Sequence, residues 1–234
     1  MFRVGVVSAL LGLGPVAVPA NAQTAVYPAK SIRMLVGFPP GGSTDVLARQ
    51  IGARLGEALG QQVVIDNRPG ATGNMASETV AKANPDGYTL LMATVSSHGI
   101  NPALFRKVPY DPVKDFQPVT LVATYPLVLA ANPAAGARTT RQLIELAKAK
   151  PGQIRVASSG NGSPGHLAAE IFKSMSGADL LHIPYKGGAP STIAVLANEA
   201  QVTFATLPGM MPHLKSGRAI ALGVTTAARS PALP

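Results

Sequence analysis

From residue 27 onward the chain repeats one pattern, in which a short apolar or β-branched run leads into a turn rich in glycine and proline and then into a helical stretch. Such alternation is typical of parallel strands covered by helices. We therefore expect an α/β fold with parallel or mixed sheets flanked by helices. Strands are predicted at residues 32–36, 63–66, 88–93, 154–157, 180–183, 201–205 and 220–225. Helices are predicted at residues 45–59, 75–83, 140–149, 164–176, 190–198 and 209–216.

A long extended segment divides this pattern into two parts. Two turn signals, Asp111-Pro112 and Gln117-Pro118, lead into an apolar stretch at residues 119–131 that can cross from one domain to another. A chain of 234 residues is long enough for two small domains, each with its own core. We expect lobe 1 at residues 23–130 and lobe 2 at residues 131–225.

Charge and cysteine content exclude several classes of function. The net charge is +9, but the basic residues are scattered, and the densest runs, at 138–141 and 148–150, are interpreted as solvated helix ends. A nucleic-acid footprint needs basic residues clustered on one face, so no nucleic-acid partner is expected. The positive surplus instead favours encounters with anionic solutes. The chain has no cysteine, which excludes disulfides and thiolate chemistry.

The N-terminus has the features of a secretory signal peptide. Met1-Phe2-Arg3 gives a positive start, residues 4–18 are mainly apolar, and Ala20-Asn21-Ala22 fits a cleavage site with small residues. The apolar run is shorter than the roughly 20 residues that span a bilayer, which argues against a retained anchor. We expect residues 1–22 to be removed and the mature protein to be periplasmic.

Four glycine-rich loops lie where a predicted strand hands over to a helix, at residues 38–45, 69–74, 158–166 and 185–190. In open α/β sheets, ligands bind at the carboxyl ends of the strands, where these loops lie. Glycine leaves backbone N–H groups and the positive end of the next helix free to face an anion. The loops therefore predict a site that holds a carboxylate mainly through the backbone. For any single loop, the alternative is a tight turn with a helix N-cap.

Side chains in the first loop can add to such a site. Ser43 or Thr44 can donate a hydroxyl hydrogen bond to a ligand oxygen. Asp45 is expected to cap its helix or to accept an ammonium group. The second loop ends at Asn74, which is a further candidate for ligand contact.

A dinucleotide cofactor is not expected. Residues 160–165 match the glycine fingerprint formally, but the acidic ribose partner should end the next strand, and Asp179 precedes that strand. The histidines at 98, 166, 182 and 213 have no metal-ligand spacing, and no paired carboxylates stand out in the loops. Ser163 and His166, three residues apart, leave open a rival hypothesis of a secreted enzyme acting on an anionic substrate.

Several motifs together resemble the Bug (TctC-like) family, whose members are the periplasmic receptors of tripartite tricarboxylate transporters. The resemblance covers nearly all of the mature chain and rests on residues 27–33, 38–45, 57–61, 67–74, 85–90, 183–190 and 229–234. It implies a two-lobed periplasmic-binding-protein fold of type II-like character that closes on its ligand, without cofactor, metal or catalysis. It also implies a monomer that captures a small organic carboxylate for the membrane subunits of the transporter.

Carried onto this sequence, the resemblance places the ligand against the glycine-rich loops of both lobes. The residues that it implies are Gly41, Gly42, Ser43, Thr44 and Asp45 in lobe 1, and Ser158, Gly162, Ser163, His166, Tyr185 and Lys186 in lobe 2. A receptor that feeds a signalling system is an alternative to transport.

Two departures from the family pattern stand out. Ala197-Asn198 occupies the place of a usual glycine pair, which makes the turn before residue 201 uncertain. Relatives also continue beyond Pro234 with elements that return to lobe 1, so the resemblance implies that residues 226–234 are a truncated connection back towards lobe 1. Part of the lobe 1 sheet is then expected to be missing and an edge to be unpaired.

Overall fold

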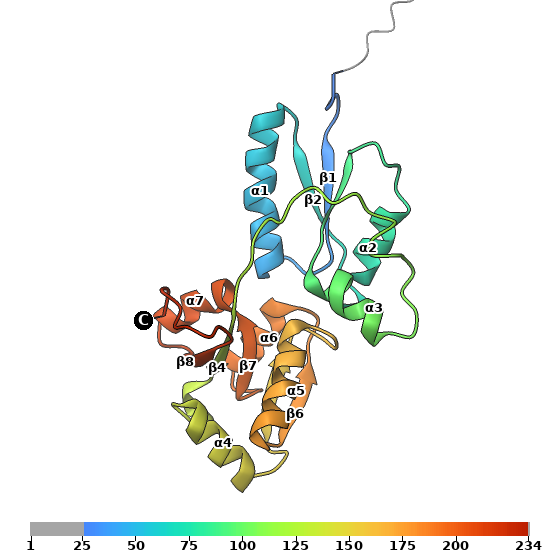
Figure 1. Ribbon diagram of the computed structural model, residues 1–234. Helices are drawn as coiled ribbons and strands as arrows, with labels where there is room; N and C mark the ends of the chain where they lie inside the picture. Colours follow the sequence, from blue (N-terminus) through green and yellow to red (C-terminus); the bar gives the residue numbers. More distant parts are fainter. Residues whose placement is uncertain (1–25, 234) are drawn as a thin grey trace, which may run out of the picture.

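The computed structural model describes residues 26–233 and divides them between two sheets, each with its own helices (Figure 1). We call the first sheet with its helices lobe 1 and the second sheet with its helices lobe 2. The expected signal peptide, residues 1–22, lies outside the described residues. Within the described range, none of the helices has the length and apolar character needed to cross a bilayer.

Lobe 1 is built on a three-stranded parallel sheet with the order β2-β1-β3. Short apolar runs form the strands, and each strand returns through a helix, as the alternating pattern predicts. Glycine in the left-handed conformation at position 60, with φ of 67°, ends the first helix. The elements are β1 (Ile32–Val36), α1 (Ser43–Leu59), β2 (Val63–Asn67), η1 (Ala71–Gly73), α2 (Asn74–Ala81) and β3 (Thr89–Met92).

Two short helical segments after β3 were not predicted from the sequence. They are η2 (Ser96–Ile100) and α3 (Asn101–Leu104), and both contribute to the lobe junction described below. Each is about one turn long, and Gly99 and Pro102 interrupt any apolar period that would reveal them.

Lobe 2 is built on a five-stranded mixed sheet with the order β6-β5-β7-β4-β8. β5 is parallel to β6 and β7, whereas β4 is antiparallel to β7 and β8. The elements are β4 (Leu127–Ala131), η3 (Pro133–Ala135), α4 (Thr140–Ala149), β5 (Ile154–Ser158), α5 (Pro164–Ser176), β6 (Leu180–Pro184), α6 (Gly188–Leu196), β7 (Val202–Thr206), α7 (Leu207–Lys215) and β8 (Ile220–Val224). β4 belongs to this sheet, so the chain joins lobe 2 at Leu127, and residue 130 lies inside the strand.

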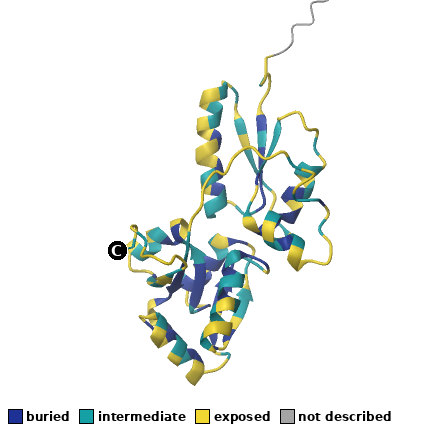
Figure 2. Ribbon diagram, viewed as in Figure 1, coloured by how far each residue is buried: buried dark blue, intermediate teal, exposed yellow. Residues whose placement is uncertain are grey.

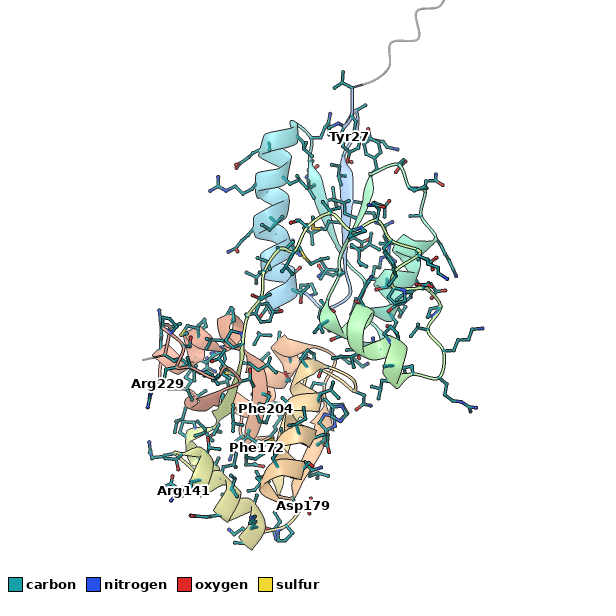
Figure 3. The ribbon with its side chains drawn as sticks, viewed as in Figure 1. Tyr27, Arg141, Phe172, Asp179, Phe204 and Arg229 are labelled. Carbon is teal, nitrogen blue, oxygen red and sulfur yellow. The ribbon has the colours of Figure 1, made fainter. Side chains whose placement is uncertain are left out.

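The two lobes have separate cores. In lobe 1, Met34, Val36, Ala48 and Met92 are buried together. In lobe 2, the larger core includes Leu143 and the pair Phe172 and Phe204, whose ring centroids lie 5.8 Å apart between α5 and β7 (Figure 3). Figure 2 shows the buried residues concentrated on the strands and on the inner faces of the helices. Separate cores allow the lobes to move as units.

Two helices of lobe 2 begin two residues earlier than predicted. α6 begins at Gly188 and α7 at Leu207, ahead of the expected starts at 190 and 209. Pro190 and Pro208 lie in the first turns of these helices. A first-turn N–H has no intrahelical partner, so proline is tolerated there and does not mark the helix boundary.

The turn before β7 uses asparagine where the family pattern has glycine. Asn198 adopts the left-handed conformation with a φ of 59°. Asparagine enters this region more readily than most residues other than glycine, so Ala197-Asn198 still forms the turn.

Replacing Asn198 tests this explanation. Asn198→Ala is expected to lower the free energy of unfolding by about 1 kcal/mol, because alanine is strained in the left-handed region. Asn198→Gly should match or slightly exceed the wild type. Urea denaturation of the three proteins measures the difference, and equal stability of the alanine and glycine variants would contradict the explanation.

Candidate functional site

The glycine-rich loops of the two lobes meet at one junction. The carboxyl ends of the parallel strands in both sheets face this junction, which lies between α1 and α3 above and α6 and α7 below in Figure 1. Ser43 Oγ and Thr206 Oγ1 lie 2.5 Å apart across it. Thr72 Oγ1 donates a hydrogen bond of 2.8 Å to the carbonyl oxygen of Asn161. The first loop therefore contacts lobe 2 at β7, and the second loop contacts the third.

Glycine allows the backbones to approach closely at this junction. A Cβ atom added to Gly187 would lie 2.7 Å from Pro39 Cδ of the first loop. One added to Gly162 would lie 2.7 Å from Leu104 Cδ2 and 3.1 Å from Asn101 Oδ1. At Gly187 a side chain would clash with the rigid proline ring, whereas at Gly162 the end of Leu104 would have to move. Both residues also have positive φ, 119° and 76°, which favours glycine.

Asp45 organises the first loop. This buried carboxylate accepts hydrogen bonds from the Gly41 N–H at 2.9 Å, from Asn67 Nδ2 at 2.9 Å and from Arg49 Nε at 3.0 Å. Asn67 Nδ2 also donates to the carbonyl oxygen of Phe38 at 3.0 Å. Asp45 thus links the loop to α1 and to the end of β2. Its oxygens are already occupied, which does not fit the expected alternatives of a helix cap or an ammonium acceptor.

These contacts also set the protonation state of Asp45. Burial raises the pKa of the carboxyl group, but the hydrogen bonds from Arg49, Gly41 and Asn67 outweigh burial and hold the pKa below its usual value. Asp45 is therefore ionised at neutral pH, which keeps it an acceptor for all three donors.

Several helices that start at the junction have no side-chain cap. Gly42, Gly73 and Gly187 are the N-cap residues of α1, α2 and α6, and none supplies a capping side chain. The first-turn N–H groups of a helix lack intrahelical partners and carry partial positive charge. The loops before α1 and α6 touch at Pro39 and Gly187. The positively polarised N-termini of these two helices, one from each lobe, therefore follow loops that are in contact. This arrangement favours a bound anion.

The second loop is strained and tied to lobe 1. Ala71 and Thr72 have φ values of 45° and 53°, in the left-handed region that non-glycine residues rarely adopt. The side chain of Asn74 is buried, and its Oδ1 accepts hydrogen bonds from Asn101 Nδ2 at 2.6 Å and Tyr110 Oη at 2.7 Å. Asn74 thus holds the loop to α3 through side-chain contacts within lobe 1. Strain of this kind concentrates at functional loops.

The third loop is held by its own polar side chains. Ser163 caps α5 by accepting a hydrogen bond of 3.3 Å from the backbone N–H of His166. The ring Nδ1 of His166 accepts from the Gly162 N–H at 3.2 Å. Ser158 Oγ lies 2.6 Å from His182 Nε2, and both serines are buried. The contact between Ser163 and His166 therefore runs through the backbone and serves the helix start.

The remaining predicted residues lie on the same junction side of lobe 2 or at the start of α1. Tyr185 is half-buried and packs against a small core, Lys186 is exposed, and Thr44 is half-buried in the first turn of α1. Sequence reasoning missed Thr206, the last residue of β7, and Gly209, in the first turn of α7. A Cβ at Gly209 would lie 2.7 Å from Ser43 Oγ, so the start of α7 also faces lobe 1. Pro208 near the N-terminus of α7 was the signal for this helix start.

The described residues contain no group of three or more His, Cys, Asp or Glu side chains arranged to hold a metal ion. Two surface hollows lie away from the junction. One, of about 460 Å³, is lined by β1 and β2, and the other, of about 500 Å³, lies beside β8. At the junction itself the loops of the two lobes are in direct contact.

Comparison with known proteins identifies the family. Residues 47–234 match the model of the tripartite tricarboxylate transporter family receptor, TctC. The chain belongs to this family. It is also 38% identical over 233 residues to protein BugT of Bordetella pertussis, an alignment that covers 98% of this chain and 71% of BugT. The resemblance inferred from the loop motifs is therefore confirmed.

Solved structures agree with this assignment. The structure of Rpa4515 from R. palustris with adipate is 39% identical, with a TM-score of 0.85, and the match covers 87% of this chain and 68% of that one. MatC from Rhodopseudomonas palustris with bound malate is 30% identical, with a TM-score of 0.82, over 88% of this chain and 70% of that one. The periplasmic-binding-protein fold expected for this TctC-family chain is confirmed, and the chain spans about two thirds of the length of these structures.

Proposed function

We propose that this TctC-family chain captures a small organic carboxylate in the periplasm and delivers it to the membrane subunits of a tripartite tricarboxylate-type transporter. The observation that carries the proposal is the meeting of glycine-rich loops from both lobes, with uncapped helix starts on each side. Backbone N–H groups at such starts bind a carboxylate without a reactive side chain. Related structures with adipate and with malate support the same ligand class.

The residues that we propose for ligand contact are those of the meeting loops. In lobe 1 they are Gly41, Gly42, Ser43 and Thr44, with Asp45 and Asn74 holding the loops in place. In lobe 2 they are Ser158, Gly162, Ser163, His166, Tyr185 and Lys186. The hydroxyl pair of Ser43 and Thr206 is an additional candidate, because both oxygens lie where the lobes touch.

Ligand entry requires the lobes to separate, because the loops contact each other directly. The two cores are distinct, and the connection at residues 117–126 carries no helix or strand, so a hinge motion disturbs few buried contacts. The net charge of +9 raises the encounter rate with an anionic ligand. We therefore propose capture by closure of the two lobes.

Calorimetric titration of the purified protein tests the proposal. Adipate and L-malate are the first probes, and the diamine hexane-1,6-diamine is the control because it matches the chain length of adipate with opposite charge. We expect at least one dicarboxylate to bind and to raise the unfolding temperature, since a ligand at 100 times its dissociation constant stabilises the native state by about 2.7 kcal/mol. A folded protein that binds no member of a wider carboxylate series would overturn the proposal.

The rival function, a secreted enzyme acting on an anionic substrate, is separated by one variant. Ser163→Ala should abolish turnover if Ser163 is a nucleophile, whereas under the receptor proposal it changes only affinity and the stability of α5. The observed role of Ser163 Oγ as the cap of α5 favours the receptor. A receptor that feeds a signalling system would be distinguished by its genomic neighbours, because transport requires genes for two membrane subunits.

A further inference from the structure

We propose that His166 and His182 form a positioning pair that holds the third loop ready for ligand only while both rings are neutral, so that acidification weakens ligand binding. The inference rests on the proposed function, because its readout is affinity for a carboxylate. Sequence reasoning placed His166 against the ligand and gave His182 no role. The structure gives both rings a role within the loop.

The two rings are stacked and each is bonded to the loop. Their centroids lie 4.1 Å apart with an angle of 22° between the planes. His166 Nδ1 accepts a hydrogen bond of 3.2 Å from the Gly162 N–H, and His182 Nε2 lies 2.6 Å from Ser158 Oγ. Ser158 Oγ also bonds the N–H and the carbonyl oxygen of Gly160, both at 3.2 Å. The pair therefore contacts the loop on both sides of Asn161.

Protonation of the His166 Nδ1 atom is incompatible with its hydrogen bond from Gly162. The Nδ1 atom of His166 accepts from a backbone N–H, and a protonated Nδ1 becomes a donor that faces another donor. Two imidazolium rings stacked at this distance also repel each other. Acidification should therefore release Gly162 and loosen the loop between Ser158 and His166.

The loosened segment is the one that reaches lobe 1. Asn161 accepts the hydrogen bond from Thr72 Oγ1, and Gly162 lies against Leu104. These contacts join the third loop to the second loop and to α3. Loss of loop geometry therefore affects closure of the lobes as well as the ligand site.

The charged groups that act on His182 are all on α5: His166, Glu170 and Lys173. Burial is the main cause that lowers the pKa of His182 below its usual value. The neighbouring His166 and Lys173 lower this pKa further, and Glu170 raises it. Glu170 is engaged with Lys173 at 3.1 Å. A histidine whose pKa is lowered in the native state favours the neutral form in the intact loop. Its contribution to the stability of the loop is therefore lost as the pH falls.

The test is calorimetric affinity for adipate or L-malate between about pH 8 and about pH 6, where histidine changes its charge. The wild type is compared with the double variant His166→Asn/His182→Gln, which keeps an acceptor near Gly162 and a polar partner for Ser158 but cannot titrate. A one-unit difference in pKa between two states changes affinity by about tenfold only well below both values, so we expect a loss of about threefold in the wild type by about pH 6. The double variant should change less than about twofold over the same range.

Three further measurements keep the inference falsifiable. His213→Gln, which removes a histidine elsewhere in lobe 2, should retain the wild-type pH profile. His166→Phe, which has no acceptor for the Gly162 N–H, should bind more weakly than His166→Asn at neutral pH. NMR titration of the ring carbons should show His182 taking up its proton below the usual histidine pKa.

The outcomes separate the two proposals. Parallel pH profiles for the wild type and the double variant would overturn the role of the histidine pair while leaving the receptor function intact. Absence of carboxylate binding in all variants at every pH would overturn the receptor function, and the inference with it.

Discussion

Replacing Asp45 by alanine is expected to weaken ligand binding by at least tenfold and to destabilise the protein by about 2 to 3 kcal/mol. The carboxylate is only 2% exposed and accepts hydrogen bonds from Gly41, Asn67 and Arg49. Its removal leaves the Gly41 N–H and an Asn67 N–H without their acceptor. Arg49 is half-exposed, so its ion pair contributes little, and most of the loss comes from the other two donors.

The effect of Asp45 should depend on pH. Burial opposes ionisation, but the bonds from Arg49, Gly41 and Asn67 lower the pKa of Asp45 overall. The stabilisation is therefore present above the unfolded pKa, which is about 3.9, and is lost as the pH falls through the lower native value. Asp45→Asn retains one acceptor oxygen, so it should lose less stability at neutral pH than Asp45→Ala. Its free energy of unfolding should also fall less steeply than that of the wild type as the pH is lowered.

Urea denaturation and calorimetric titration measure both parts of the prediction. Asp179→Asn is the matched control, because Asp179 is an exposed carboxylate in lobe 2 near the end of α5 (Figure 3). It should leave stability and affinity unchanged. If Asp45→Ala binds the dicarboxylate like the wild type, the first loop does not depend on Asp45 and the geometry proposed for it is wrong.

Gly165→Ala is expected to destabilise lobe 2 by about 2 to 3 kcal/mol through a clash with the backbone. An added Cβ would lie 2.4 Å from the carbonyl oxygen of Phe204 on β7. A backbone atom cannot rotate away, so α5 would have to shift from the sheet. α5 carries Ala169 and Phe172 of the lobe 2 core and begins at the third loop, so both the core and the ligand site should be affected.

Gly188→Ala is the matched control for this substitution. Gly188 also lies in the first turn of a helix, but a Cβ there would meet no atom within 4 Å. Alanine favours helix over glycine by up to about 1 kcal/mol, so stability should be unchanged or slightly higher. Equal urea midpoints for the two variants would show that the close contact between α5 and β7 is not needed for stability.

The fold followed from the sequence because its signals are local. Strand, glycine turn and helix recur along the chain, and thirteen expected elements all occur, with boundaries that differ by a few residues. The helical segments that were missed, η1, η2, α3 and η3, are too short to show a period. The placement of β4 was also beyond the sequence, because residues 119–131 have the same extended character on both sides of Leu127 and only pairing with β7 and β8 assigns the strand.

The sequence predicted which loops form the candidate site, but not what each side chain in those loops does. Glycine at the end of a strand marks a loop at the edge where ligands bind in such sheets, and this signal located the four junction loops but not the start of α7. The roles of Asp45 and Asn74 depend on partners such as Asn67 and Tyr110, which no spacing rule identifies. The role of Ser163 is the N-cap alternative that the loop sequence already offered. His182 received no role because its partners, Ser158 and His166, lie 24 and 16 residues away in the chain and meet it only across the strands and α5.

The sequence by itself determined the α/β architecture and the loops that line the junction, because periodicity and turn chemistry act over a few residues. The family was inferred from the resemblance of its motifs. Only the tertiary structure decided which loops touch, which strand belongs to which sheet, and which polar side chains are already engaged within their own lobe. Those properties depend on distances between residues that are far apart in the chain, and folding sets these distances through the packing of two separate cores.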